Sequence, residues 1–113
     1  MEEEKLYSLS QLESLSGGDE VFVNKMVDMF LQLTPQTIEV LKESYAEDEL
    51  ETMGGAAHKI KPTIDMMGIE KIKQAVRDLE QYGKNRSHLE LIPGILTEVC
   101  ETLEKVVVQL ENR

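Results

Sequence analysis

His58 is the residue of this sequence best placed for covalent chemistry. An α-helix turns about 100° per residue, and at that spacing the apolar residues around His58 gather in one sector while His58 faces water on the opposite side. These apolar residues are Leu50, Met53, Ala57, Ile60, Ile64 and Met67. An unperturbed histidine has a pKa of about 6.5, so in the neutral ring one nitrogen can act as a nucleophile while the other keeps its proton. Such a ring can accept a phosphoryl group.

Lys61 lies one helical turn beyond His58 on the same face. A phosphoryl group carries nearly two negative charges, and Lys61 can partly neutralise them before and after transfer. Lys59 lies about 100° round the helix and reaches the site only by bending its long side chain, so it serves as general positive potential. Gly54 and Gly55 keep this face small, which allows a bulky partner to approach closely.

Pro62 is an unusual residue at this position of a helix. It lacks the N–H that would bond the carbonyl of His58, four residues earlier. We therefore expect a bend at the turn that presents the imidazole. Such conflicts between local rules and the overall pattern are often found at functional sites.

The rest of the chain is predicted to be helical, since apolar residues recur at helical spacing and no run of alternating β-branched residues suggests a strand. Pro35 is expected to kink the second helix rather than split it. Helix starts are predicted at Ser10 with Glu13, Asp19, Asp48 with Glu51, and Ser87 with Glu90. A break or restart is predicted at Pro93–Gly94. Helix ends are predicted at Gly17–Gly18, Tyr45, Gly68 and Gly83.

Short connections between the four long helices favour antiparallel neighbours. The sequence therefore predicts an all-α protein: one domain over residues 1–113, folded as an antiparallel up-down-up-down four-helix bundle with a short additional N-terminal helix. Residues 1–7, which include Glu2, Glu3 and Glu4, are predicted to be a frayed segment.

The composition of the chain indicates which classes of partner are unfavourable and which cellular compartment to expect. Twelve basic against twenty-two acidic residues give a net charge of -10, which disfavours nucleic acid and anionic membrane surfaces. Cys100 is the only cysteine, and its apolar surroundings suggest a small buried residue in a reducing compartment. No stretch approaches the roughly 20 apolar residues that span a bilayer, and the acidic start has the wrong charge for a secretory signal. We expect a cytoplasmic protein without membrane contact.

Other residues have simpler structural interpretations. Four methionines are interpreted as core filler, and these are Met26, Met29, Met53 and Met67. Met66 is expected to be partly exposed and could belong to a docking surface. His88 is interpreted as a loop or helix-start residue. A metal site built from His58 and His88 is not expected, because no third ligand is spaced to join them.

The run from Ala57 to Gly68 resembles the histidine-containing phosphotransfer (HPt) domain, with Ala57–His58, Ile60–Lys61 and Gly68 in matching places. The resemblance covers essentially the whole chain. It extends from Leu9–Leu12 and Ser16–Asp19 at the entry to Leu79–Glu80 and Gly83–Lys84 in the helix after the histidine.

This resemblance implies a phosphorelay intermediate of two-component signal transduction. The phosphorylated aspartate of a receiver domain would donate to His58, and the resulting phosphohistidine would donate to an aspartate of another receiver. Lys61 is implied as the stabilising cation. Glu80 falls where some members of the family place a glutamine that hydrogen-bonds the histidine, and it could fix the ring tautomer.

Two further residues bear on the resemblance. Lys84 falls where a second basic residue can face the phosphate. Pro62 departs from the family pattern, which has a small residue, usually glycine, after the lysine. Pro62 keeps the face compact, and we interpret it as a variant of the same site.

Three functional classes follow from these observations. The first is a phosphoryl carrier with no kinase activity and no cofactor of its own, in which any Mg²⁺ belongs to the receiver. Its expected partners are response-regulator receiver domains and a hybrid sensor histidine kinase, and a monomer suffices for this role. The second is a non-phosphorylated helical adaptor that docks receivers or other signalling proteins. The third, a metal-binding or hydrolytic helical domain, has the least support.

Overall fold

A computed structural model describes residues 4–113, and it is built from helices. These are α1 (Ser10–Ser16), α2 (Glu20–Ala46), α3 (Leu50–Met66), the short 3₁₀ helix η1 (Glu70–Ile72), α4 (Lys73–Asn85) and α5 (Ile92–Glu111). No strand occurs among the described residues. The all-α prediction is confirmed. None of the described helices is both long and apolar enough to cross a membrane.

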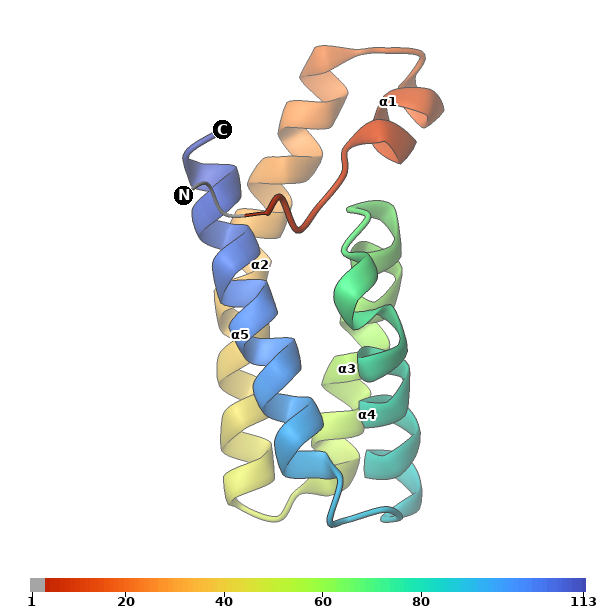
Figure 1. Cartoon of the computed structure of the whole chain (residues 1–113), viewed down its shortest axis with the longest axis vertical. Coiled ribbons are helices and arrows are strands. Elements are labelled where there is room, and N and C mark those ends of the chain that lie inside the picture. The colour runs from red at the N-terminus through yellow and green to blue at the C-terminus, as the bar shows by residue number, and fades with distance from the viewer. Residues whose placement is uncertain (1–3) are drawn as a thin grey trace.

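The four long helices form a bundle in which successive helices run in opposite directions (Figure 1). Helix α3 packs between α2 and α4, and α5 closes the bundle by packing on both α4 and α2. Helix α1 packs on the part of α2 that extends beyond the other helices (Figure 1). The predicted bundle with a short additional N-terminal helix is therefore present.

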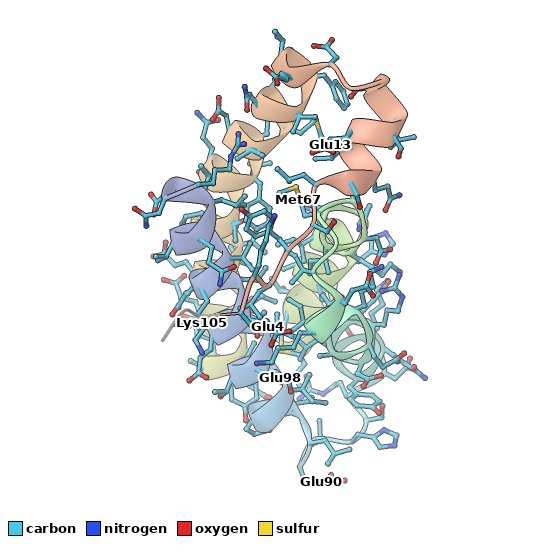
Figure 2. All side chains as sticks on the ribbon, turned by 45° about the horizontal axis from the view of Figure 1, so that its top comes forward. Glu4, Glu13, Met67, Glu90, Glu98 and Lys105 are labelled. Atoms are coloured by element: carbon cyan, nitrogen blue, oxygen red, sulfur yellow. The ribbon has the colours of Figure 1, made fainter. Side chains whose placement is uncertain are left out.

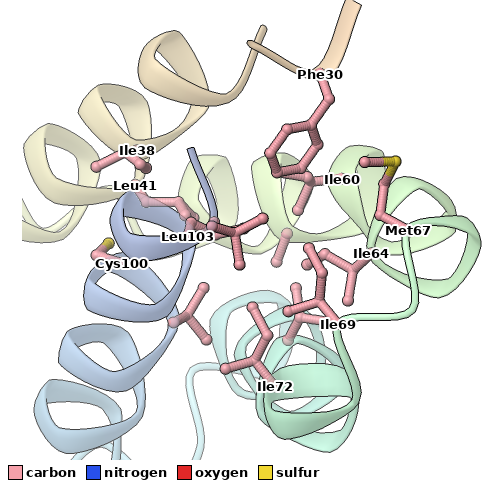
Figure 3. Packing of buried hydrophobic residues seen from close by; sticks show 14 of the residues in the cluster. Phe30, Ile38, Leu41, Ile60, Ile64, Met67, Ile69, Ile72, Cys100 and Leu103 are labelled. Carbon is pink, nitrogen blue, oxygen red and sulfur yellow. The ribbon is translucent and has the colours of Figure 1, made fainter. Parts of the chain in front are cut away.

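One hydrophobic core joins the helices (Figure 3). Phe30 and Leu41 of α2, Ile64 of α3 and Leu103 of α5 are almost fully buried in it. Every residue of the apolar stripe predicted around His58 is buried as well. Cys100 lies in the same core, and burial raises the pKa of its thiol to about 11. The prediction of a buried cysteine is confirmed.

Both internal prolines are accommodated within unbroken helices. Helix α2 is continuous through Pro35, and α3 continues through Pro62 to Met66. A proline inside a helix costs about 3 kcal/mol. The long buried face of each helix offsets that cost, since tertiary packing of an apolar face supplies most helical stability in proteins. The expectation that Pro35 does not split its helix is confirmed.

Helix starts were predicted less well than helix spans. Asp19 caps α2 as expected, because its carboxylate accepts hydrogen bonds from the N–H groups of Val21 and Phe22. The predicted capping box of Ser10 and Glu13 is wrong, since Leu9 is the residue before the helix and no side chain caps it. Local spacing alone did not show that Ser10 already belongs to the first turn.

The predicted caps of α3 and α5 are also wrong. Asp48 adopts a left-handed backbone with φ of 58°, and its carboxylate pairs with Arg86 at 3.0 Å instead of capping α3. Ser87 and Glu90 do not cap α5, which begins at Ile92 without a side-chain cap. Pro93 stands in the first turn of α5, where a missing N–H costs little, so the predicted restart at Pro93–Gly94 is confirmed.

The segment before α1 is held against the bundle. Leu6 donates its N–H to Gln109 Oε1 of α5 at 2.9 Å, Ser8 donates to the Met67 carbonyl at 2.9 Å, and Tyr7 is buried. Gly68 ends the α3 region as predicted, at φ of 61°, and a Cβ there would lie 2.9 Å from Ser8 Cβ. The predicted frayed segment is thus wrong for residues 4–7, because an aromatic residue anchors them; residues 1–3 lie outside the described part.

The acidic side chains are distributed over the outside of the bundle. Glu13, Glu90 and Glu98 project from three different parts of the chain into solvent (Figure 2). Three described acidic residues, Asp65, Asp78 and Glu80, are partly buried, and the side chain of Glu80 is only 15% exposed. Its environment defines the candidate site.

Candidate functional site

His58 lies in the middle of α3 with its ring in solvent. Its side chain is 58% exposed, whereas the neighbouring residue Ala57 and the next apolar residue, Ile60, are buried. The burial of the apolar face of α3 turns the opposite face, and His58 with it, outward. The orientation predicted from helical spacing is confirmed.

The imidazole is hydrogen-bonded to a carboxylate from the next helix. Nδ1 of His58 lies 2.6 Å from Oε2 of Glu80 on α4. An ionised carboxylate can only accept hydrogen bonds, so the ring donates its Nδ1–H and carries no proton on Nε2 in the neutral form. Nε2 therefore keeps its lone pair as a free nucleophile on an exposed ring.

Two lysines hold Glu80 in its ionised form. Lys61 Nζ donates to Glu80 Oε1 at 2.7 Å, and Lys84 Nζ donates to Oε2 at 3.0 Å. The hydrogen bonds from Lys61 and Lys84 lower the pKa of Glu80 to about 2, with a smaller contribution from His58 and against an opposing effect of burial. We call His58, Lys61, Glu80 and Lys84 the histidine cluster. Two ammonium groups and one carboxylate give it one net positive charge while the ring is neutral.

Two glycines bring α3 and α4 close enough to form this cluster. A Cβ on Gly83 would lie 2.5 Å from the Leu50 carbonyl oxygen and 2.9 Å from the backbone nitrogen of Gly54. A Cβ on Gly54 would lie 2.9 Å from the Glu80 carbonyl oxygen. Both positions therefore require glycine. Because Glu80 is one turn before Gly83 and His58 one turn after Gly54, this contact places the carboxylate beside the ring.

The structure corrects two predictions about these glycines. Gly83 was predicted to end its helix, but α4 continues to Asn85. Arg86, which follows it, is the C-cap and has a left-handed backbone. Gly54 was predicted to allow a partner to approach, but it is buried against α4. Gly55 does face open space, with nothing within 4 Å of an added Cβ.

A second ion pair joins the same two helices. Arg77 of α4 donates to Asp65 Oδ2 of α3 at 2.7 Å. Asp65 stands two turns beyond His58 on the same face of α3. This pair fixes the α3–α4 contact on the far side of Lys61 and makes no contact with the imidazole.

On its other side, α3 forms a groove with α2. The α2–α3 groove comprises two adjoining cavities of about 250 and 530 Å³ that share Leu33 of α2 and Lys59 of α3. Met29 and Val40 of α2 extend it in the two directions, and Gly55 lines it next to His58. Among the described residues that line it, Lys59 is the only charged one.

The groove was missed by sequence analysis, although a signal for it exists. Met29, Leu33 and Val40 recur at intervals of four and seven residues on α2, and their exposed fractions are 44%, 55% and 42%. Met29 was predicted to be core and is instead exposed at the groove, and Met26 is only partly buried there. The core assignment is confirmed for Met53 and Met67.

The second histidine lies in the connection after α4. The His88 ring stacks on Tyr82 with 4.3 Å between ring centroids. Its φ is 51°, as in a tight turn, which agrees with its interpretation as a loop residue. Within residues 4–113, no group of three or more histidine, cysteine or acidic side chains is arranged to hold a metal ion.

Comparison with known families decides what kind of domain carries this cluster. The family model of the Hpt domain matches residues 25–113, which include α3, α4 and α5 entirely. The chain belongs to the Hpt domain family. Hpt domains are phosphocarriers that act in two-component phosphorelays through a histidine and interact with receiver domains. No curated protein and no solved structure matched the chain in the same comparisons.

The structure of this Hpt domain brings together four of the six residues singled out in the sequence. His58, Lys61, Glu80 and Lys84 form one connected set of hydrogen bonds. Lys59 lies outside the set, at the α2–α3 groove. The sixth residue, Pro62, is exposed on the turn after His58.

We predict that Gly83→Ala destabilises the Hpt domain by about 1 to 3 kcal/mol, because the added methyl group meets backbone atoms that cannot move aside. Urea unfolding measures this change. Gly55→Ala is the matched control, since it adds the same methyl group in open space and should be neutral or stabilising by up to about 1 kcal/mol. Equal effects of the two substitutions would contradict the close-approach role of Gly83.

Proposed function

We propose that this Hpt domain is a phosphorelay intermediate in which His58 takes a phosphoryl group from the aspartate of one receiver domain and passes it to the aspartate of another. The hydrogen bond from Nδ1 of the exposed His58 ring to Glu80 is the observation that supports this most directly. It leaves Nε2 unprotonated, accessible and oriented away from α4. A nucleophile for in-line attack on phosphorus needs these properties.

In the proposed transfer, the lone pair of His58 Nε2 forms the bond to phosphorus while the bond from phosphorus to the receiver's aspartate oxygen breaks. The electron pair of that bond leaves with the aspartate carboxylate. The proton on Nδ1 stays where it is, held by Glu80. We expect the receiver to supply Mg²⁺ for this step, so the chain described here needs no cofactor of its own.

Lys61 and Lys84 provide the positive charge for the phosphoryl group. Their side chains are 29% and 48% exposed, so both ammonium groups reach solvent next to the ring while they pair with Glu80. Phosphoryl oxygens on Nε2 would compete with Glu80 for these donors, since charge-assisted hydrogen bonds to phosphate are strong. Lysine suits this exchange because its long side chain can move without a backbone change.

The α2–α3 groove is the proposed docking surface for the receiver. It lies beside His58, it exposes the apolar side chains of Met29, Leu33 and Val40, and Lys59 gives it a positive charge on a chain whose net charge is -10. A receiver surface with apolar residues next to an acidic phosphorylation site complements it. Docking there would bring the receiver's aspartate to the exposed face of the ring, and a monomer of the Hpt domain suffices.

Phosphorylation of His58 can be tested with a phosphorylated receiver and Mg²⁺. Wild-type protein should gain phosphate that is labile in acid and stable in base, and His58→Gln should gain none. His88→Gln is the matched control and should be labelled like wild type, because His88 lies outside the histidine cluster. If wild type took up no label from any receiver tested, the non-phosphorylated adaptor would become the better explanation.

Lys61→Ala should slow phosphoryl transfer about tenfold, which corresponds to about 1.4 kcal/mol. The substitution removes the cation that is one turn from His58 and closest to Glu80. Stopped-flow or quench-flow measurement of transfer checks the rate, and urea unfolding checks that the fold is kept. A transfer rate equal to that of wild type would show that Lys61 does not stabilise the phosphoryl group.

Leu33→Glu should weaken receiver binding at least tenfold by placing a charge in the apolar part of the α2–α3 groove. The apparent KM for the receiver should rise while the transfer rate at saturation changes little. Val108→Glu is a matched control, since Val108 is also 55% exposed but lies on α5. Similar effects of both substitutions would argue against docking at this groove.

A further inference from the structure

The Glu80 carboxylate is placed against the ring nitrogen that the transfer reaction does not use. Its Oε2 lies 2.6 Å from His58 Nδ1, and its two oxygens also accept from Lys61 and Lys84. Since its pKa is lowered to about 2, Glu80 has no proton to donate near neutral pH. The proton of this hydrogen bond must therefore be carried by Nδ1 of His58.

Phosphorylation of Nε2 changes what this contact requires. A phosphorylated ring that lost its Nδ1 proton would place a bare nitrogen lone pair 2.6 Å from a carboxylate oxygen, and two acceptors at that distance repel each other. A ring that keeps the proton becomes a cation beside the carboxylate, and the opposite charge favours it. The contact thus selects the protonated form of the phosphorylated ring.

We propose that Glu80 keeps Nδ1 protonated after His58 is phosphorylated, which makes the ring a good leaving group and the phosphohistidine short-lived. This inference rests on the proposed function of His58 and adds a role for Glu80 in the second half of the relay. Glu80 is a positioning residue in this scheme, because it acts on the phosphoryl group only through the ring.

The bonds and protons balance without an external acid. In onward transfer, an oxygen of the acceptor aspartate bonds to phosphorus, the N–P bond breaks, and its electron pair returns to Nε2 as a lone pair. The imidazolium cation becomes the neutral ring with its proton on Nδ1, which is the form present before phosphorylation. An unprotonated phosphorylated ring would have to leave as an imidazole anion, which is a much poorer leaving group.

Other charged groups near the ring also influence whether Nδ1 is protonated, but Glu80 is the group hydrogen-bonded to it. Lys61 and Lys84 oppose protonation of the ring, but both pair directly with the same carboxylate. On α3, Glu51 and Asp65 stand two turns away from His58 in either direction, and Asp65 is paired with Arg77. From the side of α2, the described residues that line the groove carry no charge, and Lys59 of α3 points there.

Glu80→Gln tests this role with little change in side-chain size. The amide oxygen can still accept the Nδ1–H of the free ring, and the amide nitrogen can donate to a bare Nδ1 once Nε2 is phosphorylated. The isolated phosphorylated variant should therefore hydrolyse about tenfold more slowly than wild type at pH 8, and the pH below which hydrolysis accelerates should fall by about one unit. The decay rate does not depend on how much label each protein took up.

Asp65→Asn is the matched control. It also removes one carboxylate from this face of the α3–α4 pair, but Asp65 pairs with Arg77 and does not contact the imidazole. Its phosphorylated form should decay at the wild-type rate. A slowing equal to that of Glu80→Gln would attribute the effect to net charge and overturn the proposal.

A spectroscopic measurement on the wild type keeps the test independent of any variant. With ¹⁵N-labelled histidine, Nδ1 of phosphorylated wild type should still be protonated at pH 8. A bare Nδ1 at that pH, or equal decay of wild type and Glu80→Gln between pH 6 and 9, would overturn the inference. A wild-type protein that accepts no phosphate would instead contradict the proposed function, so the two failures can be told apart.

Discussion

The close approach of α3 and α4 at Gly54 and Gly83 is the constraint on which the rest of the site depends. The backbones touch there, as the short distances from an added Cβ show. A carboxylate on a glutamate side chain reaches only a few ångströms, so Glu80 can contact a ring on the neighbouring helix only where the two helices lie this close. The glycine pair therefore acts on the imidazole through geometry, although neither glycine contacts it.

Within that geometry, Glu80 has two electrostatic effects that must be balanced. It orients the ring by accepting the Nδ1–H, and it also reduces the positive charge that Lys61 and Lys84 can offer to a phosphoryl group. The two lysines exceed the single carboxylate by one charge, so the cluster stays attractive to an anion. One lysine alone would leave the cluster neutral beside the ring, and the chain as a whole, at -10, would repel the phosphoryl group.

Features that depend on contacts within one helix could be predicted from the sequence, whereas contacts between residues far apart in the chain could not. The helical character of the long segments and the outward orientation of His58 follow from apolar periodicity within one helix, and both predictions were confirmed. The contact of His58 with Glu80 joins residues 22 positions apart, and it was suggested only by resemblance to a family. The close approach of α3 and α4 that produces this contact was not predicted, because Gly83 was interpreted as the end of a helix. A glycine that ends a helix and a glycine at a helix contact look the same in one sequence.

The predictions of helix starts were wrong for a related reason. Asp48 and Ser87 are residue types that often cap helices, but Asp48 pairs with Arg86, 38 positions away, and α5 begins only at Ile92, beyond Ser87. The α2–α3 groove was missed because its apolar residues share helical periodicity with the core stripe of α2, and periodicity alone does not say which residues a neighbouring helix covers. The position of α3 leaves Met29, Leu33 and Val40 exposed in a groove that Gly55 and Lys59 of α3 also line. Packing of α3 against α4 on one side thus gives the ring its hydrogen-bond partner, while incomplete coverage of α2 on the other side leaves the apolar surface that we propose as the docking surface for a receiver.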